Sequence, residues 1–283
     1  MRIGVVGLGL IGGSLAQAYH RAGHEVYGFD ISRITLDFVR MEGSIDEILS
    51  EENVNTCDAV FLAIPPEQAV TWLKKNAGAL TSSTLVVDCC GVKRQICREA
   101  FQLMETTDLQ FMGGHPMAGV QKWGFKNSTP DLFQGAVFAM VPKDPNDIRF
   151  MEKVKKLLMI VGFKTFQVMT PEEHDRVIAF TSQLSHVVSN AFIKSDTSRL
   201  KACVAAGGSY RDMTRVAYLN DEVWTELMMD NRDNLGREID GLMEELSEYR
   251  EALASGDRDH LCQLLKEGRI RKEESEAETG ENA

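Results

Sequence analysis

The chain has 283 residues, of which 43% are hydrophobic, and it carries a formal net charge of −11 at pH 7. This length is enough for two ordinary domains with buried cores. The negative charge disfavours nucleic acid or an anionic membrane surface as a partner, because either would repel the average field of the protein. We therefore expect a small-molecule partner.

The chain begins directly with a strand-like segment, and its apolar runs are far shorter than the roughly 20 residues needed to cross a bilayer. Its six cysteines lack the paired spacing that zinc sites use. These features predict a soluble cytoplasmic protein with reduced thiols and without a bound metal.

The first 169 residues alternate short β-rich runs with helical patterns, which is typical of βαβ units around a mostly parallel sheet. Strands are predicted over residues 2–6, 25–29, 59–63, 84–88, 109–113, 136–141 and 164–168. We therefore predict an α/β, doubly wound Rossmann domain over residues 1–169.

A glycine-rich turn joins the first predicted strand to the helix that follows it. The turn reads Gly7-Leu8-Gly9-Leu10-Ile11-Gly12, the spacing of a dinucleotide-binding fingerprint. Gly7 permits the tight turn, Gly9 lets a pyrophosphate approach the backbone, and Gly12 lets the helix pack on the strand. Between a strand and an apolar helix, a turn without a ligand is the weaker interpretation.

Two further features complete the predicted cofactor site. Asp30 ends the second strand, where an acid accepts the ribose hydroxyls of adenosine and would repel a 2′-phosphate. NAD is therefore favoured over NADP. Arg33 argues against this preference if it pairs with that phosphate, but an arginine here can equally stack on adenine. The run Ala63-Ile64-Pro65 ends the third predicted strand, at the carboxyl edge where open α/β sheets bind ligands.

At residue 170 the pattern becomes purely helical. The run Thr170-Pro171-Glu172-Glu173 places a capping hydroxyl, a proline and two carboxylates where a helix N-terminus favours them. Apolar residues then recur at helical spacing over 177–191 and again over 224–253. We expect an all-α domain over residues 170–271 whose apolar faces form a homodimer, followed by a disordered acidic tail over 272–283.

One histidine is predicted at the edge of the sheet where the nicotinamide of a bound dinucleotide must lie. His115 belongs to the glycine-rich run 113–119, which follows the fifth predicted strand. An ordinary imidazole pKa of about 6.5 suits removal of a proton from a carbinol while hydride leaves the same carbon. A histidine that only fixes a glycine-rich loop explains this position equally well from these residues.

Four motifs in order resemble the prephenate/arogenate dehydrogenase family of tyrosine biosynthesis over nearly the whole chain; they span residues 88–93, 113–119, 182–186 and 207–215. The resemblance implies NAD-dependent oxidative decarboxylation of prephenate to 4-hydroxyphenylpyruvate, with His115 taking the proton of the ring C4 hydroxyl as hydride passes to NAD. It also implies that Arg215 holds the ring carboxylate and that His186 helps to fix the substrate's carboxylates.

The chain departs from the family pattern at Gly91, where many relatives carry a serine that contacts the histidine and the substrate; this position is still expected to line the substrate site. Gln183 stands where some relatives have a second histidine. Gln121, just past His115, offers no carboxylate to an ammonium group and so favours prephenate over arogenate. The same sequence features also fit a 3-hydroxyacid-type dehydrogenase or a non-catalytic NAD-binding protein, although less well.

Overall fold

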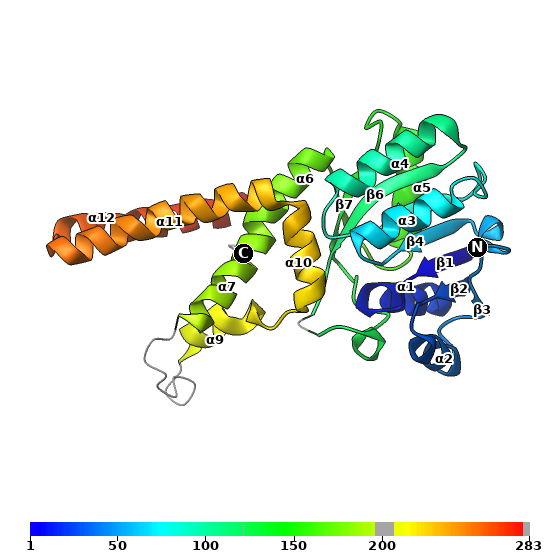
Figure 1. Ribbon diagram of the computed structural model, residues 1–283, viewed down its shortest axis with the longest axis horizontal. Coiled ribbons are helices and arrows are strands. Elements are labelled where there is room, and N and C mark those ends of the chain that lie inside the picture. Colours follow the sequence, from blue (N-terminus) through cyan, green and yellow to red (C-terminus); the bar gives the residue numbers. More distant parts are fainter. Residues whose placement is uncertain (121, 196–206, 280–283) are drawn as a thin grey trace. The chain divides into compact units, whose positions relative to one another are not determined.

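The computed structural model describes residues 1–120, 122–195 and 207–279, and divides into two compact units, Met1–Arg232 and Asp233–Ala283 (Figure 1). Gln121 and residues 280–283 of the predicted tail lie outside the described residues. In the described part of the chain, no helix is both long and apolar enough to cross a membrane.

The first unit is built on an eight-stranded sheet in the order β3-β2-β1-β4-β5-β6-β7-β8. Neighbouring strands are parallel except β6 and β7, which run antiparallel. The order of the first six strands is that of the dinucleotide-binding fold, so the predicted Rossmann class is confirmed. The strands are Arg2–Val6 (β1), Glu25–Phe29 (β2), Glu47–Ile48 (β3), Ala59–Leu62 (β4), Leu85–Asp88 (β5), Gln110–Met117 (β6), Val137–Val141 (β7) and Thr165–Val168 (β8).

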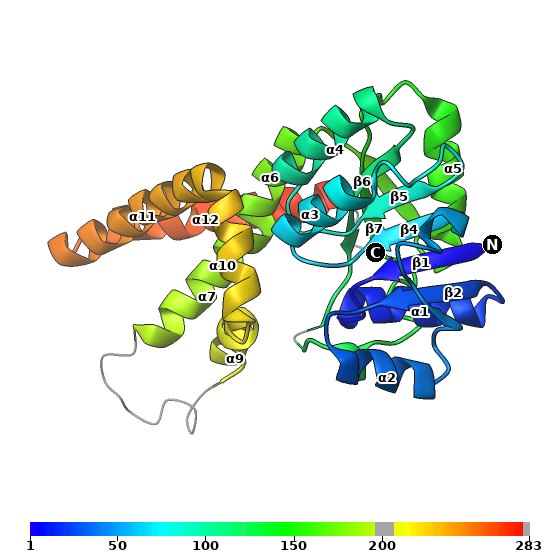
Figure 2. The same ribbon diagram turned by 45° about the vertical axis from the view of Figure 1, so that its right-hand side comes forward.

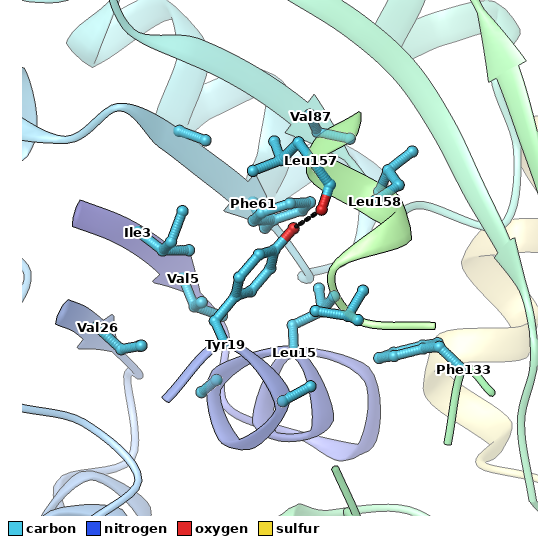
Figure 3. Close-up of a cluster of buried hydrophobic side chains, with 14 of the residues drawn as sticks. Ile3, Val5, Leu15, Tyr19, Val26, Phe61, Val87, Phe133, Leu157 and Leu158 are labelled. Atoms are coloured by element: carbon cyan, nitrogen blue, oxygen red, sulfur yellow. Dashed lines mark hydrogen bonds between the residues drawn. The ribbon is translucent and has the colours of Figure 1, made fainter. Parts of the chain in front are cut away.

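Helices cover both faces of this sheet (Figure 2). One buried cluster joins strand side chains to α1, α2 and α5, and a second joins the alternate side chains to α3 and α4. In the first cluster the ring of Tyr19 lies against Phe61, and its hydroxyl donates to the Leu157 carbonyl at 2.9 Å (Figure 3). The helices are Leu10–Arg21 (α1), Arg33–Met41 (α2), Pro66–Asn76 (α3), Arg94–Thr106 (α4) and Ile148–Met159 (α5).

The helical part of the first unit starts where the sequence predicts. The Thr170 hydroxyl accepts from the Glu173 amide at 3.2 Å, and the Glu173 carboxylate accepts from the Thr170 amide at 2.8 Å, which completes a capping box. The predicted first helix is interrupted by one π-helical segment, η3. The elements are Pro171–Ile178 (α6), Ala179–Leu184 (η3), Ser185–Lys194 (α7), Gly208–Thr214 (α9), Arg215–Ala217 (η4) and Asp221–Asp230 (α10).

The two compact units separate after Arg232, whereas the change of sequence pattern falls at residue 170. Helices α6 and α10 belong to the first unit because polar side chains tie them to α4. Asp175 of α6 accepts from the Arg94 backbone amide at 3.0 Å, and the Arg94 guanidinium donates to the Asp230 carbonyl at 3.3 Å.

The second unit contains a pair of antiparallel helices, α11 (Arg232–Ser255) and α12 (Arg258–Thr279), which lie side by side in Figures 1 and 2. The hydroxyl of Tyr249 on α11 donates to the Leu264 carbonyl of α12 at 3.3 Å. The helical pattern predicted over 224–253 is divided at Asn231, which ends α10 before α11 begins.

The predicted tail is wrong for its first part, because α12 continues through Thr279. Charged side chains one turn apart support this extension: Arg269 pairs with Glu273 at 2.5 Å, and Lys272 pairs with Glu276 at 3.0 Å. Such pairs stabilise a polar helix without burying apolar surface, so a low content of large apolar side chains did not prevent helix formation here.

Candidate active site

The glycine-rich turn has the geometry of a loop that receives a phosphate. Gly7 has φ +87°, and a Cβ there would lie 2.5 Å from the Ala63 carbonyl oxygen. A Cβ on Gly12 would lie 1.8 Å from the Gly7 carbonyl oxygen, so this position also requires glycine. A Cβ on Gly9 would meet nothing within 4 Å. The turn is therefore closed toward β4 and open at Gly9, next to the N-terminus of α1 at Leu10.

The other predicted cofactor residues converge on the same edge of the sheet. Both Asp30 carboxylate oxygens accept backbone hydrogen bonds at 2.8 Å, one from Leu8 in the turn and one from Ser32. The Ile64 carbonyl, which follows β4, accepts from the Cys90 thiol at 3.3 Å. The carboxyl ends of β1, β2 and β4 therefore bring the turn, the acid and the run 63–65 together.

His115 lies inside a strand rather than in the loop that was predicted to follow one. β6 extends to Met117, and His115 is paired with Ala139 of the antiparallel strand β7. The Gly114 amide also donates to Asp88 at 3.0 Å. The sequence placed the end of this strand at 113 because glycine and proline lower strand propensity, but pairing with β7 overrides that preference.

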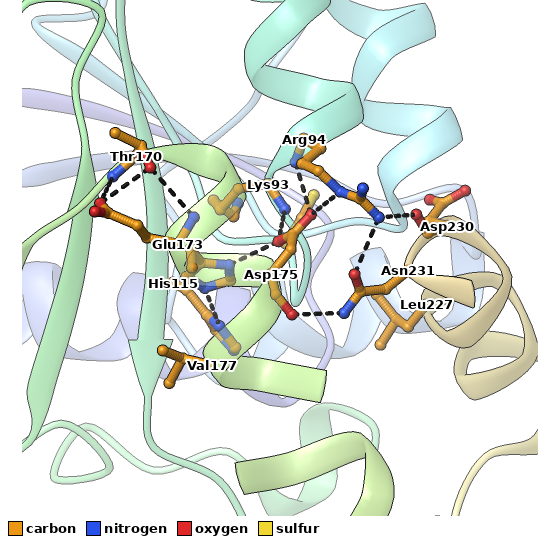
Figure 4. A network of polar contacts seen from close by, with 12 residues as sticks. Lys93, Arg94, His115, Thr170, Glu173, Asp175, Val177, Leu227, Asp230 and Asn231 are labelled. Carbon is orange, nitrogen blue, oxygen red and sulfur yellow. Dashed lines mark hydrogen bonds and ion pairs between the residues drawn. The ribbon is translucent and has the colours of Figure 1, made fainter. Parts of the chain in front are cut away.

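Two further residues continue from His115 in a line of hydrogen bonds. Nδ1 of His115 lies 3.0 Å from Nε2 of His174, and Nδ1 of His174 lies 2.8 Å from Oδ1 of Asp175. Asp175 also accepts from the backbone amides of Lys93 at 2.7 Å and Arg94 at 3.0 Å (Figure 4). His174 and Asp175 are buried, whereas His115 is partly exposed. This line of contacts joins β6, α6 and the N-terminus of α4.

These surroundings favour a neutral His115 and an ionised Asp175. Burial, followed by the neighbouring His174 ring and the Lys93 ammonium, lowers the pKa of His115 well below its ordinary value. Burial would raise the pKa of Asp175, but hydrogen bonds from His174 and the Arg94 amide outweigh it and lower this pKa. His115 can therefore accept a proton at neutral pH.

A fully buried ion pair lies beside this line. Nζ of Lys93 is 2.6 Å and 2.5 Å from the two carboxylate oxygens of Asp88, and both side chains have no exposed surface. Asp88 also accepts from the Cys90 amide at 2.7 Å and from the Gly114 amide. The pair thus holds the end of β5 against the strand that carries His115.

A cleft of about 1020 Å³ in the first unit brings several predicted residues to one space. Leu10 and Ile11 of the glycine-rich turn, together with His186 and Arg215, line it. His115 and Gly91 are not among the lining residues, although Ala118, three residues after His115, is. Other lining residues are Gly119, Lys122, Trp123, Ser182, Tyr218 and Trp224.

His186 is held in place on two sides. Its Nδ1 lies 2.8 Å from the Ser182 carbonyl, which makes Nδ1 a donor, and its ring lies against that of Trp224 with centroids 3.8 Å apart and the planes tilted by 31°. Burial lowers the pKa of His186, the Ser182 carbonyl opposes this shift, and the nearby Arg215 charge adds to it. Nε2 of His186 is therefore the atom left for a ligand.

Gly91 is covered by a side chain that sequence reasoning did not connect to it. A Cβ on Gly91 would lie 3.2 Å from both terminal methyl groups of Leu227 on α10. A serine at this position would require Leu227 to move by a few tenths of an ångström. The structure therefore places the Leu227 side chain over Gly91, the position that was expected to line the substrate site.

Sequence reasoning missed His174 and Asp175, which continue the hydrogen bonds of His115. An imidazole next to a carboxylate in the first turns of an amphipathic helix was the available signal. His115, the partner of His174, lies 59 positions away along the chain, and the backbone donors to Asp175 lie 81 or more positions away. No local pattern could therefore predict these contacts.

Comparisons with known proteins match both parts of the chain. Residues 15–167 match the family model described as "Prephenate dehydrogenase, nucleotide-binding domain", and residues 170–267 match "Prephenate dehydrogenase, dimerization domain". The prephenate dehydrogenase of Bacillus subtilis is 30% identical over 271 residues, which cover 93% of this chain and 72% of that protein.

Solved structures agree over nearly the full length of the chain. A prephenate dehydrogenase from Aquifex aeolicus, in complex with hydroxyphenyl propionate and NAD+, superposes with a TM-score of 0.85 at 28% identity, covering 97% of this chain and 98% of that one. Synechocystis arogenate dehydrogenase superposes with a TM-score of 0.80 at 29% identity, covering 97% and 100%. With its fingerprint turn, histidine-bearing strand and helical part in this arrangement, the chain belongs to the prephenate dehydrogenase family.

Proposed function

We propose that this chain catalyses the NAD-dependent oxidative decarboxylation of prephenate to 4-hydroxyphenylpyruvate. The observation that carries this proposal is the charge of the cleft beside the glycine-rich turn. The positive charges of Lys122 and Arg215 line it together with the imidazole of His186, and among its lining residues that the structure describes there is no aspartate or glutamate. Such a lining favours a substrate with two carboxylates and opposes one with an added ammonium group.

Each group then has a role that its chemistry suits. His115 removes the proton of the ring hydroxyl as hydride leaves the same carbon for the nicotinamide. Arg215 holds the ring carboxylate, for which the guanidinium fork is well shaped. His186 helps to fix a substrate carboxylate through Nε2, because the negative charge of the bound carboxylate opposes the lowered pKa of the ring and favours its protonation. Loss of carbon dioxide makes the ring aromatic, which drives the reaction forward. Gly91 lies beneath Leu227 and outside the lining of the cleft, so it has no direct role in the proposed chemistry.

NAD is the proposed cofactor, bound by the turn 7–12, by Asp30 and by the run 63–65. The open space at Gly9 fits the pyrophosphate. The Asp30 carboxylate is fixed to the turn through the Leu8 amide. Its negative charge there fits the adenosine ribose and opposes a 2′-phosphate.

We infer that the enzyme works in the cytoplasm, where the five described cysteines remain the free thiols that the structure shows.

Steady-state kinetics with two substrates and two cofactors test the function. Prephenate with NAD should give the largest kcat/KM of the four combinations. A larger value for arogenate would transfer the assignment to that substrate, as the likeness to Synechocystis arogenate dehydrogenase allows. A larger value with NADP would contradict the role given to Asp30.

Replacement of Arg215 by alanine is expected to raise KM for prephenate by about 10²-fold while kcat changes by only a few-fold, because a charge-assisted bidentate contact to a ground-state carboxylate is lost. The same assay on Arg176→Ala, an exposed arginine of α6 outside the cleft, is the matched control. A large loss of kcat at unchanged KM would show that Arg215 acts on the chemical step instead.

We infer that the enzyme is a homodimer formed through its helical part. Large apolar side chains lie exposed on the second unit, with Leu246 and Met243 about 60% exposed on α11 and Leu265 equally so on α12. Met243 and Leu246 are three positions apart and therefore lie on the same side of α11, and contiguous apolar surface commonly marks a protein–protein contact. The family model that matches residues 170–267 is described as a dimerization domain, which supports the same inference.

Leu246→Glu should convert the dimer to a monomer at micromolar concentration, because it places a charge in the apolar contact. Analytical ultracentrifugation of this variant and of Glu244→Gln, an exposed neighbour on the same helix, measures the effect. If the Leu246→Glu protein keeps the mass of the unmodified dimer, the contact lies elsewhere.

A further inference from the structure

The line of contacts behind His115 determines which of its nitrogens carries hydrogen. A carboxylate only accepts hydrogen bonds, so Nδ1 of His174 donates to Asp175 across the 2.8 Å contact. Nε2 of a neutral His174 is then an acceptor, and the hydrogen in the 3.0 Å contact belongs to Nδ1 of His115. Nε2 of His115 is left with its lone pair free, which is what a general base requires.

The far end of this line is an anchored negative charge. Asp175 accepts from the amides of Lys93 and Arg94, the first backbone groups of α4, and from the Arg94 guanidinium at 3.3 Å. A helix N-terminus favours an anion. Asn231 also ties the backbone of Asp175 at 2.7 Å. A carboxylate held by this many donors remains ionised and fixed beside His174.

We propose that His174 and Asp175 are positioning residues that hold His115 in the tautomer with a free Nε2 and take up positive charge when that atom accepts a proton. This inference rests on the proposed function, since the reaction provides the proton. The substrate O–H bond breaks as the Nε2–H bond of His115 forms, and the Nδ1 hydrogen of His115 moves to Nε2 of His174. The charge comes to rest against the Asp175 carboxylate, while the hydride leaves the ring carbon for NAD.

His174 has no exposed surface, so in the intact protein bulk water does not compete with it for the hydrogen bond to Nδ1 of His115. A purely structural role would require only an acceptor near Nδ1 of His115. Uptake of charge requires an imidazole. Variants that keep the acceptor but lose the imidazole separate these two roles.

Nitrogen-15 NMR of the histidine rings in the NAD-bound protein tests the tautomer. The His115 and His174 signals of the unmodified protein are assigned by their loss in His115→Asn and in His174→Gln. For both residues, these signals should show hydrogen on Nδ1 and none on Nε2. Hydrogen on Nε2 of His115 would overturn the proposal. This measurement needs no turnover, so it decides the tautomer even if the unmodified enzyme fails to oxidise prephenate and the proposed function falls.

Kinetics of two variants test the transfer of charge. His174→Phe should lower kcat by about 10²-fold with little change in KM, and His174→Gln, which retains an acceptor, should lie within about 10-fold of the unmodified enzyme. In mixtures of H₂O and D₂O, kcat of the unmodified enzyme should curve with deuterium content, as expected for two protons in motion, and kcat of His174→Gln should be linear.

The exposed residue His20 of α1 offers the matched control, because His20→Gln should leave both kcat and the curvature unchanged. Curvature that persists in His174→Gln would overturn the transfer of charge. Unchanged kcat in both His174 variants would overturn the positioning role as well. If His174→Phe fails to fold, the NMR measurement still tests the tautomer of His115, and His174→Gln still tests the transfer of charge.

Discussion

His115→Asn is expected to lower kcat for prephenate by roughly 10²–10⁴-fold while NAD binding stays unchanged, because asparagine cannot accept the proton that the substrate hydroxyl loses during hydride transfer. The side chain stands on β6, whose backbone is paired with β7, so the substitution should leave the fold intact. Steady-state kinetics and titration of NAD by fluorescence measure the two effects. A variant with near-normal kcat would show that His115 is not the general base, whether or not His174 and Asp175 position its ring.

The pH profile gives an independent check on the same residue. The neutral form of His115 is the base, so kcat/KM must fall when the pH drops through its pKa. Burial, together with His174 and the Lys93 ammonium, lowers that pKa. The acidic limb should therefore lie below about pH 6.5, the region where an ordinary histidine titrates, and it should disappear in the residual activity of His115→Asn. A limb above that region would mean that another group controls the proton.

Lys93→Met should cause the largest loss of stability of any single substitution discussed, about 3–5 kcal/mol in the free energy of unfolding. It leaves the fully buried Asp88 carboxylate without its counter-charge. The backbone donors Cys90 and Gly114 remain, but they do not neutralise it. Urea unfolding followed by circular dichroism measures the change, and activity should fall with it, because Asp88 holds the backbone next to His115.

Two companion proteins make this test specific. The double variant Lys93→Met/Asp88→Asn should be more stable than Lys93→Met, since no unpaired charge remains. Lys74→Met breaks a surface pair in which Nζ lies 2.7 Å from Glu99, and should cost about 1 kcal/mol or less. Equal stability of the single and double variants would show that Asp88 is not the source of the loss.

The local patterns of the chain predicted the fold class well because they arise from short-range physics. The turn 7–12 requires glycine where a Cβ would strike the backbone, and the capping box at Thr170 and Glu173 satisfies amides within one turn. The nearly continuous apolar runs of β1, β4 and β5 reflect strands that are covered by helices on both faces. The capping box and the contact between Gly12 and Gly7 involve only neighbours within a few positions, and the apolar runs can be read in the same short windows, although Gly7 also packs against Ala63 of a distant segment. The residues of the predicted cofactor site follow from the same rules.

Errors occurred where distant parts of the chain overrode local preference. β6 extends through Gly114 and His115 because β7 offers it a complete row of partners. The apolar helical pattern that continues past residue 230 is divided at Asn231, whose side chain bonds the Asp175 carbonyl at 2.7 Å and the Gln183 side chain at 2.8 Å. Neither interaction can be inferred from periodicity.

The sequence determined the dinucleotide turn, the class of fold and the histidine proposed to carry the chemistry, since spacing within short segments specifies each of them. Only the tertiary structure decided what stands behind that histidine. The imidazole of His174, the carboxylate of Asp175 and the N-terminus of α4 meet His115 because long-range packing brings separate elements within hydrogen-bonding distance. The same packing places Leu227 over Gly91. Proton acceptance depends on such contacts, because burial and fixed partners, rather than residue type, establish which nitrogen is free.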